Sequence, residues 1–125
     1  MKIKSIRQAK KLKGRRVLLR VDFNVPINKD GQVGKNEDYR LTQSLPTIKY
    51  LIKKKAKIII MAHLGRPEGK RVEKLRLDPV AVRLSQLLRK SIYKSDIIIG
   101  KEVEQKIEHM KPGEILLLEN VRFDR

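Results

Sequence analysis

The sequence predicts an α/β domain built around a parallel β-sheet. Three apolar runs, at residues 17–19, 58–61 and 115–118, lack the alternation of polar and apolar residues that marks a strand with one wet face. Such runs are typical of strands that are buried on both faces, as in parallel sheets covered by helices. Segments with helical spacing separate the runs, and this alternation of strands and helices favours a parallel sheet.

The first helical pattern follows the first apolar run. Its apolar residues, spaced to share one helix face, are Leu41, Leu45, Ile48 and Ile52. Pro46 lies inside this pattern, so the helix either begins near Pro46 or carries a kink there. Three lysines at residues 53–55 close its C-terminal end, where cations interact favourably with the helix dipole.

The second helix is expected to have Asp78 as its N-cap and Pro79 at its first helical position. Its apolar face comprises Val80, Leu84, Leu87 and Leu88. The third helix carries Val103, Ile107 and Met110, and the Lys-Pro-Gly sequence at residues 111–113 ends it. The segment between these helices is ambiguous, because either residues 92–93 or residues 97–99 can form a strand.

Composition narrows the class of protein and of partner. The chain has 125 residues, 31 of them Lys or Arg and 14 Asp or Glu, which gives a net charge of +17. This length suits one domain, and the lack of cysteine excludes disulfides and thiolate chemistry. No apolar run approaches the roughly 20 residues that span a bilayer, so a cytoplasmic protein is expected. The excess positive charge should attract anions.

Polar and basic residues follow each of the three predicted strands. In open parallel sheets, ligands bind beyond the carboxyl ends of the strands. The residues that follow the runs, together with an arginine at the start of the first helix, are therefore the candidate site. In chain order they are Asp22, Asn24, Arg40, His63, Arg66 and Arg122.

Together these six residues describe a pocket for a small, polyanionic and hydroxylated metabolite. The three arginines offer bidentate forks to carboxylate or phosphate oxygens, and His63 adds a charge that titrates near neutral pH. Asp22 and Asn24 can exchange hydrogen bonds with substrate hydroxyls. Structural alternatives remain open, because Asp22 can brace its loop, Asn24 can form an Asx turn and a histidine after a strand is often structural.

A nucleic-acid-binding protein is the main alternative, and it rests on charge alone. Such a protein is expected to carry aromatic stacking platforms or a recognition helix. The chain has two Phe, three Tyr and no Trp, and no recognised nucleic-acid-binding motif is present. A structural or interaction module is the third alternative.

Four segments resemble the N-terminal signatures of phosphoglycerate kinase, in the family's order and approximate spacing. They are residues 20–26 (RVDFNVP), 45–51 (LPTIKYL), 63–67 (HLGRP) and 117–123 (LLENVRF). The resemblance covers essentially the whole chain. It implies a three-layer α/β/α, Rossmann-like domain with a parallel sheet that is incomplete at one edge, and a strand near residues 92–93.

The resemblance also implies a two-domain parent enzyme. In the family, the N-terminal domain binds 3-phosphoglycerate or 1,3-bisphosphoglycerate, and the C-terminal domain binds Mg-ATP or Mg-ADP. The enzyme transfers a phosphoryl group reversibly between 1,3-bisphosphoglycerate and ADP in glycolysis. Residues 1–125 would then be a partial N-terminal domain without the C-terminal nucleotide-binding domain. Such a piece is expected to bind no cofactor or metal and to be inactive alone.

Residue roles follow from the same motifs. Asp22 and Asn24 resemble contacts to the hydroxyl and carboxylate end of the substrate. The family's basic phosphate-binding patch is matched by His63, Arg66 and Arg122. Arg40 resembles the arginine that supports the transferring phosphoryl group, where charge stabilisation is the physical need.

Two departures from the family pattern are visible. Ala62 stands where the family commonly has Ser. The family's N-terminal domain also continues beyond this length, and its further strands would lie beside the first apolar run. We therefore expect an exposed apolar sheet edge at residues 17–21 and self-association through it, whereas the full-length parent is expected to be a monomer.

Overall fold

The computed structural model describes residues 11–123. Strands and helices alternate along the chain, which confirms the α/β class. In chain order the elements are β1 (Arg16–Arg20), α1 (Tyr39–Lys53), β2 (Lys57–Met61), the 3-10 helix η2 (Glu73–Leu75), α2 (Asp78–Leu88), β3 (Tyr93–Lys94), α3 (Lys101–Glu108), β4 (Ile115–Leu117) and the 3-10 helix η3 (Val121–Phe123). None of the helices within this range is long and apolar enough to cross a membrane.

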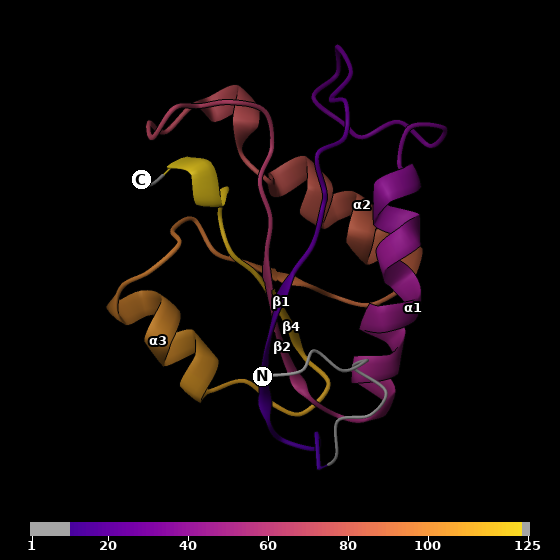
Figure 1. Ribbon diagram of the computed structural model, residues 1–125, viewed down its shortest axis with the longest axis vertical. Helices are drawn as coiled ribbons and strands as arrows, with labels where there is room; N and C mark the ends of the chain where they lie inside the picture. The colour runs from indigo at the N-terminus through magenta and orange to yellow at the C-terminus, as the bar shows by residue number, and fades with distance from the viewer. Residues whose placement is uncertain (1–10, 124–125) are drawn as a thin grey trace, which may run out of the picture.

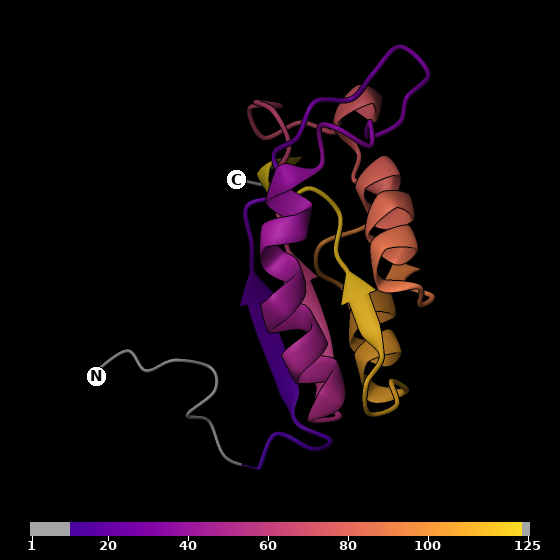
Figure 2. The ribbon, with the colours of Figure 1, turned by 90° about the vertical axis from the view of Figure 1, so that its right-hand side faces the viewer.

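The four strands form one parallel sheet in the order β1-β2-β4-β3. Figure 1 and Figure 2 show α1 and α2 on one face of this sheet and α3 on the other, so the domain has three layers. The side chains of successive β2 residues alternate between the two faces of the sheet. Ile58 and Ile60 pack in the apolar cluster of α1 and α2, whereas Ile59 packs with Val103 of α3. Burial on both faces explains why the strand residues are apolar without alternation.

β1 is the least covered of the long strands. Among residues 11–123 it pairs with β2 alone, so it forms an edge of the sheet. Val17 and Leu19 pack against the cluster of α1 and α2. Leu18 points to the opposite face and leaves 61% of its surface exposed. The expected apolar sheet edge at residues 17–21 is confirmed for the part of the chain that the structure describes.

The structure settles three open points in the element pattern. α1 begins at Tyr39 and runs through Pro46, so the alternative that the helix begins near Pro46 is wrong. β3 lies at residues 93–94, as the resemblance implies, and residues 97–99 form bends rather than a strand. α3 ends at Glu108, so Met110 lies beyond the helix, and the prediction that the helix carries Met110 is wrong.

The start of α2 also differs from the prediction. α2 begins at Asp78, and Leu77 is its N-cap, so the prediction that Asp78 caps the helix is wrong. The carboxylate of Asp78 pairs instead with the guanidinium of Arg76, at 3.2 Å. The N–H of Leu77 donates to the carboxylate of Glu119 at 2.8 Å. A side chain from the end of β4 therefore anchors the start of this helix.

Two leucines test the burial pattern. Leu84 on α2 is fully buried, and replacing it with Ala should lower the free energy of unfolding by about 2–5 kcal/mol, because apolar contacts are lost and a cavity remains. Leu18→Ala deletes the same atoms from a largely exposed side chain and should cost less than about 0.5 kcal/mol. Urea unfolding followed by circular dichroism measures both values. Similar losses for the two variants would contradict the assigned layers.

Candidate anion-binding site

The carboxyl ends of β1, β2 and β4 lead into loops at one end of the sheet, where α1 also begins (Figure 1). These loops cover residues 21–38, 62–77 and 118–123. Parallel strands bring their carboxyl ends to the same edge, so segments far apart in sequence meet there. All six residues predicted for the site lie on these loops or in the first turn of α1.

Asp22 and Arg40 form the first fixed pair of the site. Arg40 Nη1 lies 3.0 Å from Asp22 Oδ1 and also donates to the carbonyl oxygen of Asn24 at 3.2 Å. The same Asp22 oxygen accepts the backbone N–H of Asn24 at 3.1 Å. That hydrogen bond and the Arg40 charge outweigh partial burial and lower the pKa of Asp22. Asp22 is therefore an ionised acceptor, and Arg40 is held at the start of α1.

Asn24 joins two of the loops. Its Oδ1 accepts the backbone N–H of Gly65 at 2.9 Å, so it links the segment after β1 to the segment after β2. Gly65 has φ +63°, and a Cβ at this position would come within 2.7 Å of a Leu75 methyl group. Glycine avoids both this close approach and the strain of a positive φ. It is Asp22, rather than Asn24, that accepts the short-range bond of an Asx turn.

His63 is surrounded by charged groups. Burial lowers the pKa of His63 below its ordinary value of 6.5, and the positive charge of Arg122 lowers it further. Arg20 and Arg40 act in the same direction, whereas Asp22 opposes them. The imidazole is thus mainly neutral at pH 7. Arg20 was not among the predicted residues, although its place at the carboxyl end of β1 was a signal that could have found it.

Arg66 and Arg122 offer their guanidinium groups on the surface. Both side chains are exposed. Arg122 Nη1 donates to the carbonyl oxygen of Gly65 at 3.3 Å, so it lies against the loop that carries Arg66. Arg66 has no ion-pair partner within residues 11–123. The structure thus brings Asp22, Arg40, His63 and Arg122 into one electrostatic group and places Arg66 beside it.

Two buried polar residues follow β4, and the sequence pattern had assigned neither to the site. Glu119 is 1% exposed and Asn120 is fully buried. Asn120 Nδ2 donates to the carbonyl oxygens of Leu64 at 2.8 Å and Leu75 at 2.9 Å. The available signal was their position directly after an apolar run, because polar groups that are buried need hydrogen-bond partners.

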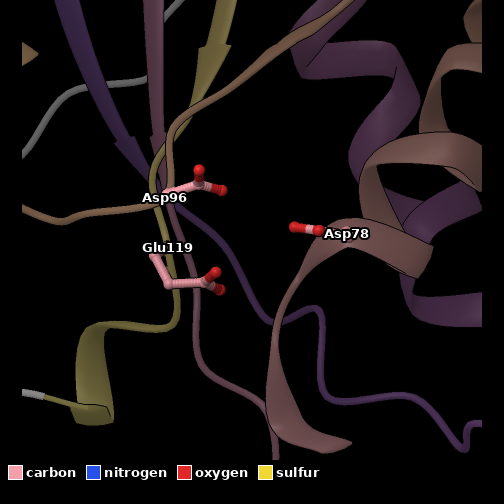
Figure 3. Close-up of side chains that lie close together, drawn as sticks. All are labelled: Asp78, Asp96 and Glu119. Atoms are coloured by element: carbon pink, nitrogen blue, oxygen red, sulfur yellow. The ribbon is translucent and has the colours of Figure 1, made fainter. Parts of the chain in front are cut away.

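Three carboxylates come close together at the same end of the sheet, as Figure 3 shows for Asp78, Asp96 and Glu119. Their oxygens lie within 4.8 Å of one another, a spacing that can hold a cation. Arg76 Nη2 already lies 3.2 Å from Asp78 and 2.6 Å from Asp96. Lys94 Nζ lies 2.7 Å from Asp78 and 2.8 Å from Glu119. We therefore assign this group as an ion-pair network that joins α2, β3 and β4.

The basic side chains stand on an open surface. A neighbouring cavity of about 670 Å³ is lined by Asn24, Gly65 and Leu75, among others, but by neither His63 nor any arginine. An anion at the predicted site would therefore be met by guanidinium groups from several loops. Contacts of this kind are screened by salt, so affinity at the site should depend on ionic strength.

Comparison with known proteins gives a consistent result. The family model described as Phosphoglycerate kinase matches residues 6–125. A phosphoglycerate kinase of Dictyoglomus turgidum is 56% identical over 112 residues, which cover 90% of this chain and 27% of the relative. One from Prochlorococcus marinus is 51% identical over 113 residues, which cover 90% of this chain and 28% of the relative.

Solved structures agree in fold as well as sequence. The phosphoglycerate kinase of Pyrococcus horikoshii matches with a TM-score of 0.79 and 38% identity, over 90% of this chain and 27% of that chain. The enzyme from Coxiella burnetii matches with a TM-score of 0.77 and 35% identity, over 96% of this chain and 28% of that chain. This chain therefore spans little more than a quarter of the length of these relatives.

The affinity of the site for anions should increase as the pH falls. An anion beside His63 favours the imidazolium form, so binding raises a pKa that lies below 6.5 in the free protein. Binding then takes up a proton. The affinity should rise as the pH falls through the bound-state pKa and level off below the free-state pKa. NMR titration with sulfate, whose own charge is constant over this range, measures this dependence.

The control for this experiment is His63→Gln, which should remove most of the pH dependence while the arginines continue to bind. His109 provides an internal reference because its ring nitrogen lies 2.7 Å from the carbonyl oxygen of Gln105 on α3. Its resonances should not respond to sulfate. An affinity of the unmodified chain that stays constant with pH would contradict the place given to His63.

Proposed function

We propose that this chain, which belongs to the phosphoglycerate kinase family, forms the phosphoglycerate-binding part of such an enzyme. The parent enzyme would transfer a phosphoryl group reversibly between 1,3-bisphosphoglycerate and ADP, giving 3-phosphoglycerate and ATP, in cytoplasmic glycolysis. The chain spans 27–28% of its relatives, so this activity is proposed for a longer protein. Residues 1–125 would belong to its N-terminal domain.

The nucleotide and its magnesium ion are assigned to another part of that protein. In the described range no glycine-rich loop follows a strand in a form that could cradle phosphates. The acidic group with metal-ligand spacing in this range is already neutralised by Arg76 and Lys94. We therefore place the Mg-ATP or Mg-ADP site of the parent enzyme outside residues 11–123.

The concentration of positive charge around His63 carries the proposal. Of the four charged groups that act most strongly on this imidazole, Arg122, Arg20 and Arg40 are cations and Asp22 is an anion. A 3-phosphoglycerate molecule brings a phosphate and a carboxylate, and both match the forked donors of arginine. Its hydroxyl group can donate to Asp22, whose lowered pKa keeps it an acceptor.

Arg40 is the residue to which the proposal gives a catalytic role. Asp22 and the carbonyl oxygen of Asn24 both accept from Nη1, and the other N–H donors of the guanidinium remain for a ligand. Phosphoryl transfer depends mainly on positioning and on electrostatic stabilisation of the transferring group. A guanidinium that is already held in place supplies this stabilisation without reorganising during the reaction.

Replacing Arg66 with Ala should weaken 3-phosphoglycerate binding by about tenfold, because one charge-assisted contact to an anion is lost. NMR or calorimetric titration of this chain measures the dissociation constant. Arg16→Ala is the matched control, since Arg16 is exposed and lies at the amino end of β1, the opposite end of the strand from the site. It removes the same charge and should leave the affinity within about twofold of the original value.

Equal affinities for the unmodified chain and Arg66→Ala would mean that the site is wrongly placed. The same preparation also tests the assignment of the nucleotide to another part of the protein. A coupled assay with Mg-ATP and 3-phosphoglycerate should detect no turnover. Robust turnover by this chain alone would overturn that assignment.

The edge strand makes self-association the second expected property of this chain. β1 pairs with β2 alone among the described residues, and the Leu18 side chain is 61% exposed on this strand. Unpaired, apolar edges promote pairing with other chains. Multi-angle light scattering should show a mass that increases with concentration, and Leu18→Lys should suppress the increase. A constant monomer mass of the unmodified chain at high concentration would count against this property.

A further inference from the structure

We infer that Asn120 is a positioning residue for the anion site: its buried amide sets where Arg66 and Arg122 stand relative to each other. This inference rests on the proposed function, because it assumes that both arginines face one anionic ligand. Asn120 itself is buried and does not contact that ligand. It acts through the main chain of the two loops that carry the arginines.

Both ends of the Asn120 amide group are hydrogen-bonded to the main chain of neighbouring segments. Nδ2 donates one hydrogen bond to the carbonyl oxygen of Leu64, at 2.8 Å, and one to that of Leu75, at 2.9 Å. Oδ1 accepts the backbone N–H of Arg122 at 3.1 Å. One side chain thus ties both ends of the loop at residues 64–75, which carries Arg66, to the segment that carries Arg122.

Other contacts hold the same two segments together along their length. Arg122 Nη1 donates to the carbonyl oxygen of Gly65 at 3.3 Å, and its own carbonyl oxygen accepts the N–H of Gly69 at 3.1 Å. Gly65 is also held by Asn24 Oδ1. The residues on either side of Arg66 therefore have little freedom to move away from Arg122.

The neighbouring Glu119 holds the main chain of Asn120 in place. The carboxylate of Glu119 accepts the backbone N–H of Asn120 at 2.9 Å and that of Leu77 at 2.8 Å. Its other oxygen lies 2.8 Å from Lys94 Nζ and 3.2 Å from Arg76 Nε. Charge-assisted hydrogen bonds of this kind are stronger than neutral ones. The main chain of Asn120 is therefore held in place independently of the contacts that its side-chain amide makes.

Asparagine is the side chain that fits this position. Two carbonyl oxygens and one N–H group face it, and an amide offers two donor hydrogens and one acceptor on a short stem. A carboxylate keeps the acceptor but turns an oxygen toward two carbonyl oxygens. A leucine fills a similar volume but leaves all three backbone groups without the partner that Asn120 supplies.

The test uses Asn120→Asp and Asn120→Leu in this chain, with 3-phosphoglycerate and sulfate as probes in NMR titrations. Both variants should raise the dissociation constant by about tenfold or more while the arginines themselves are unchanged. Asn28→Asp is matched to the first variant in charge. Asn28 uses only Oδ1 within its own loop, accepting the N–H groups of Asp30 and Gln32. The affinity of the Asn28→Asp variant for both probes should stay within about twofold of that of the unmodified chain.

Loss of stability is separated from loss of positioning by Val103→Ala. Val103 lies on α3 and packs against the sheet on the face opposite α1 and α2. The variant therefore destabilises the core without changing a residue of the site loops. All titrations are made well below the melting temperature of each variant. Val103→Ala should keep its affinity. If it loses affinity as the Asn120 variants do, general destabilisation explains the effect and the inference is overturned.

Amide hydrogen exchange gives a readout that needs no ligand. The N–H groups of Gly65 and Gly69 bond to Asn24 and Arg122, not to Asn120. Their protection should fall in both Asn120 variants if the amide holds the whole loop, and unchanged protection would overturn the inference. Failure of the unmodified chain to bind 3-phosphoglycerate would instead count against the proposed function, while the exchange data still decide the role of Asn120.

Discussion

Parallel pairing of β1, β2 and β4 is the constraint on which the rest of the molecule depends. Parallel strands need long crossover connections, and these connections are the helices that bury both faces of the sheet. The same direction of the strands brings their carboxyl ends to one edge. Asp22, His63 and Arg122 each follow a different strand, and they become neighbours only because those strands run the same way.

The segment after β4 then converts this edge into a defined surface. Burial alone would raise the pKa of Glu119, but hydrogen bonds from Lys94 and from the N–H groups of Leu77 and Asn120 outweigh it and leave the pKa lowered. A carboxyl group whose pKa is lowered by folding stabilises the fold at any pH above its unfolded-state pKa. This contribution to stability is lost as the pH falls through the folded-state pKa. Above pH 4.5 the Glu119 carboxylate thus stays ionised, whatever the protonation of His63.

Short-range sequence patterns predicted those features that short-range interactions and burial determine. The apolar runs became β1, β2 and β4, because burial on both faces selects apolar residues regardless of partner. The predicted start of α2 was wrong because the Asp78 side chain forms ion pairs with Arg76 and Lys94 instead of capping its own helix. The same limit applies to the site. That charged residues follow each strand was visible in the sequence, but the bonds of Asn24 to Gly65 and of Asn120 to the loop ends depend on contacts distant in sequence.

The surface is built against its own electrostatics. Arg122, Arg20 and Arg40 all lower the pKa of His63, which means that these groups would repel an imidazolium and also repel one another. A flexible loop would relax and separate the charges. Here the main-chain N–H of Arg122 is held by the buried Asn120, so Arg122 is not free to move away from the other cations. At the proposed site an anion would relieve this repulsion, so stability that the free fold gives up would be recovered as binding affinity.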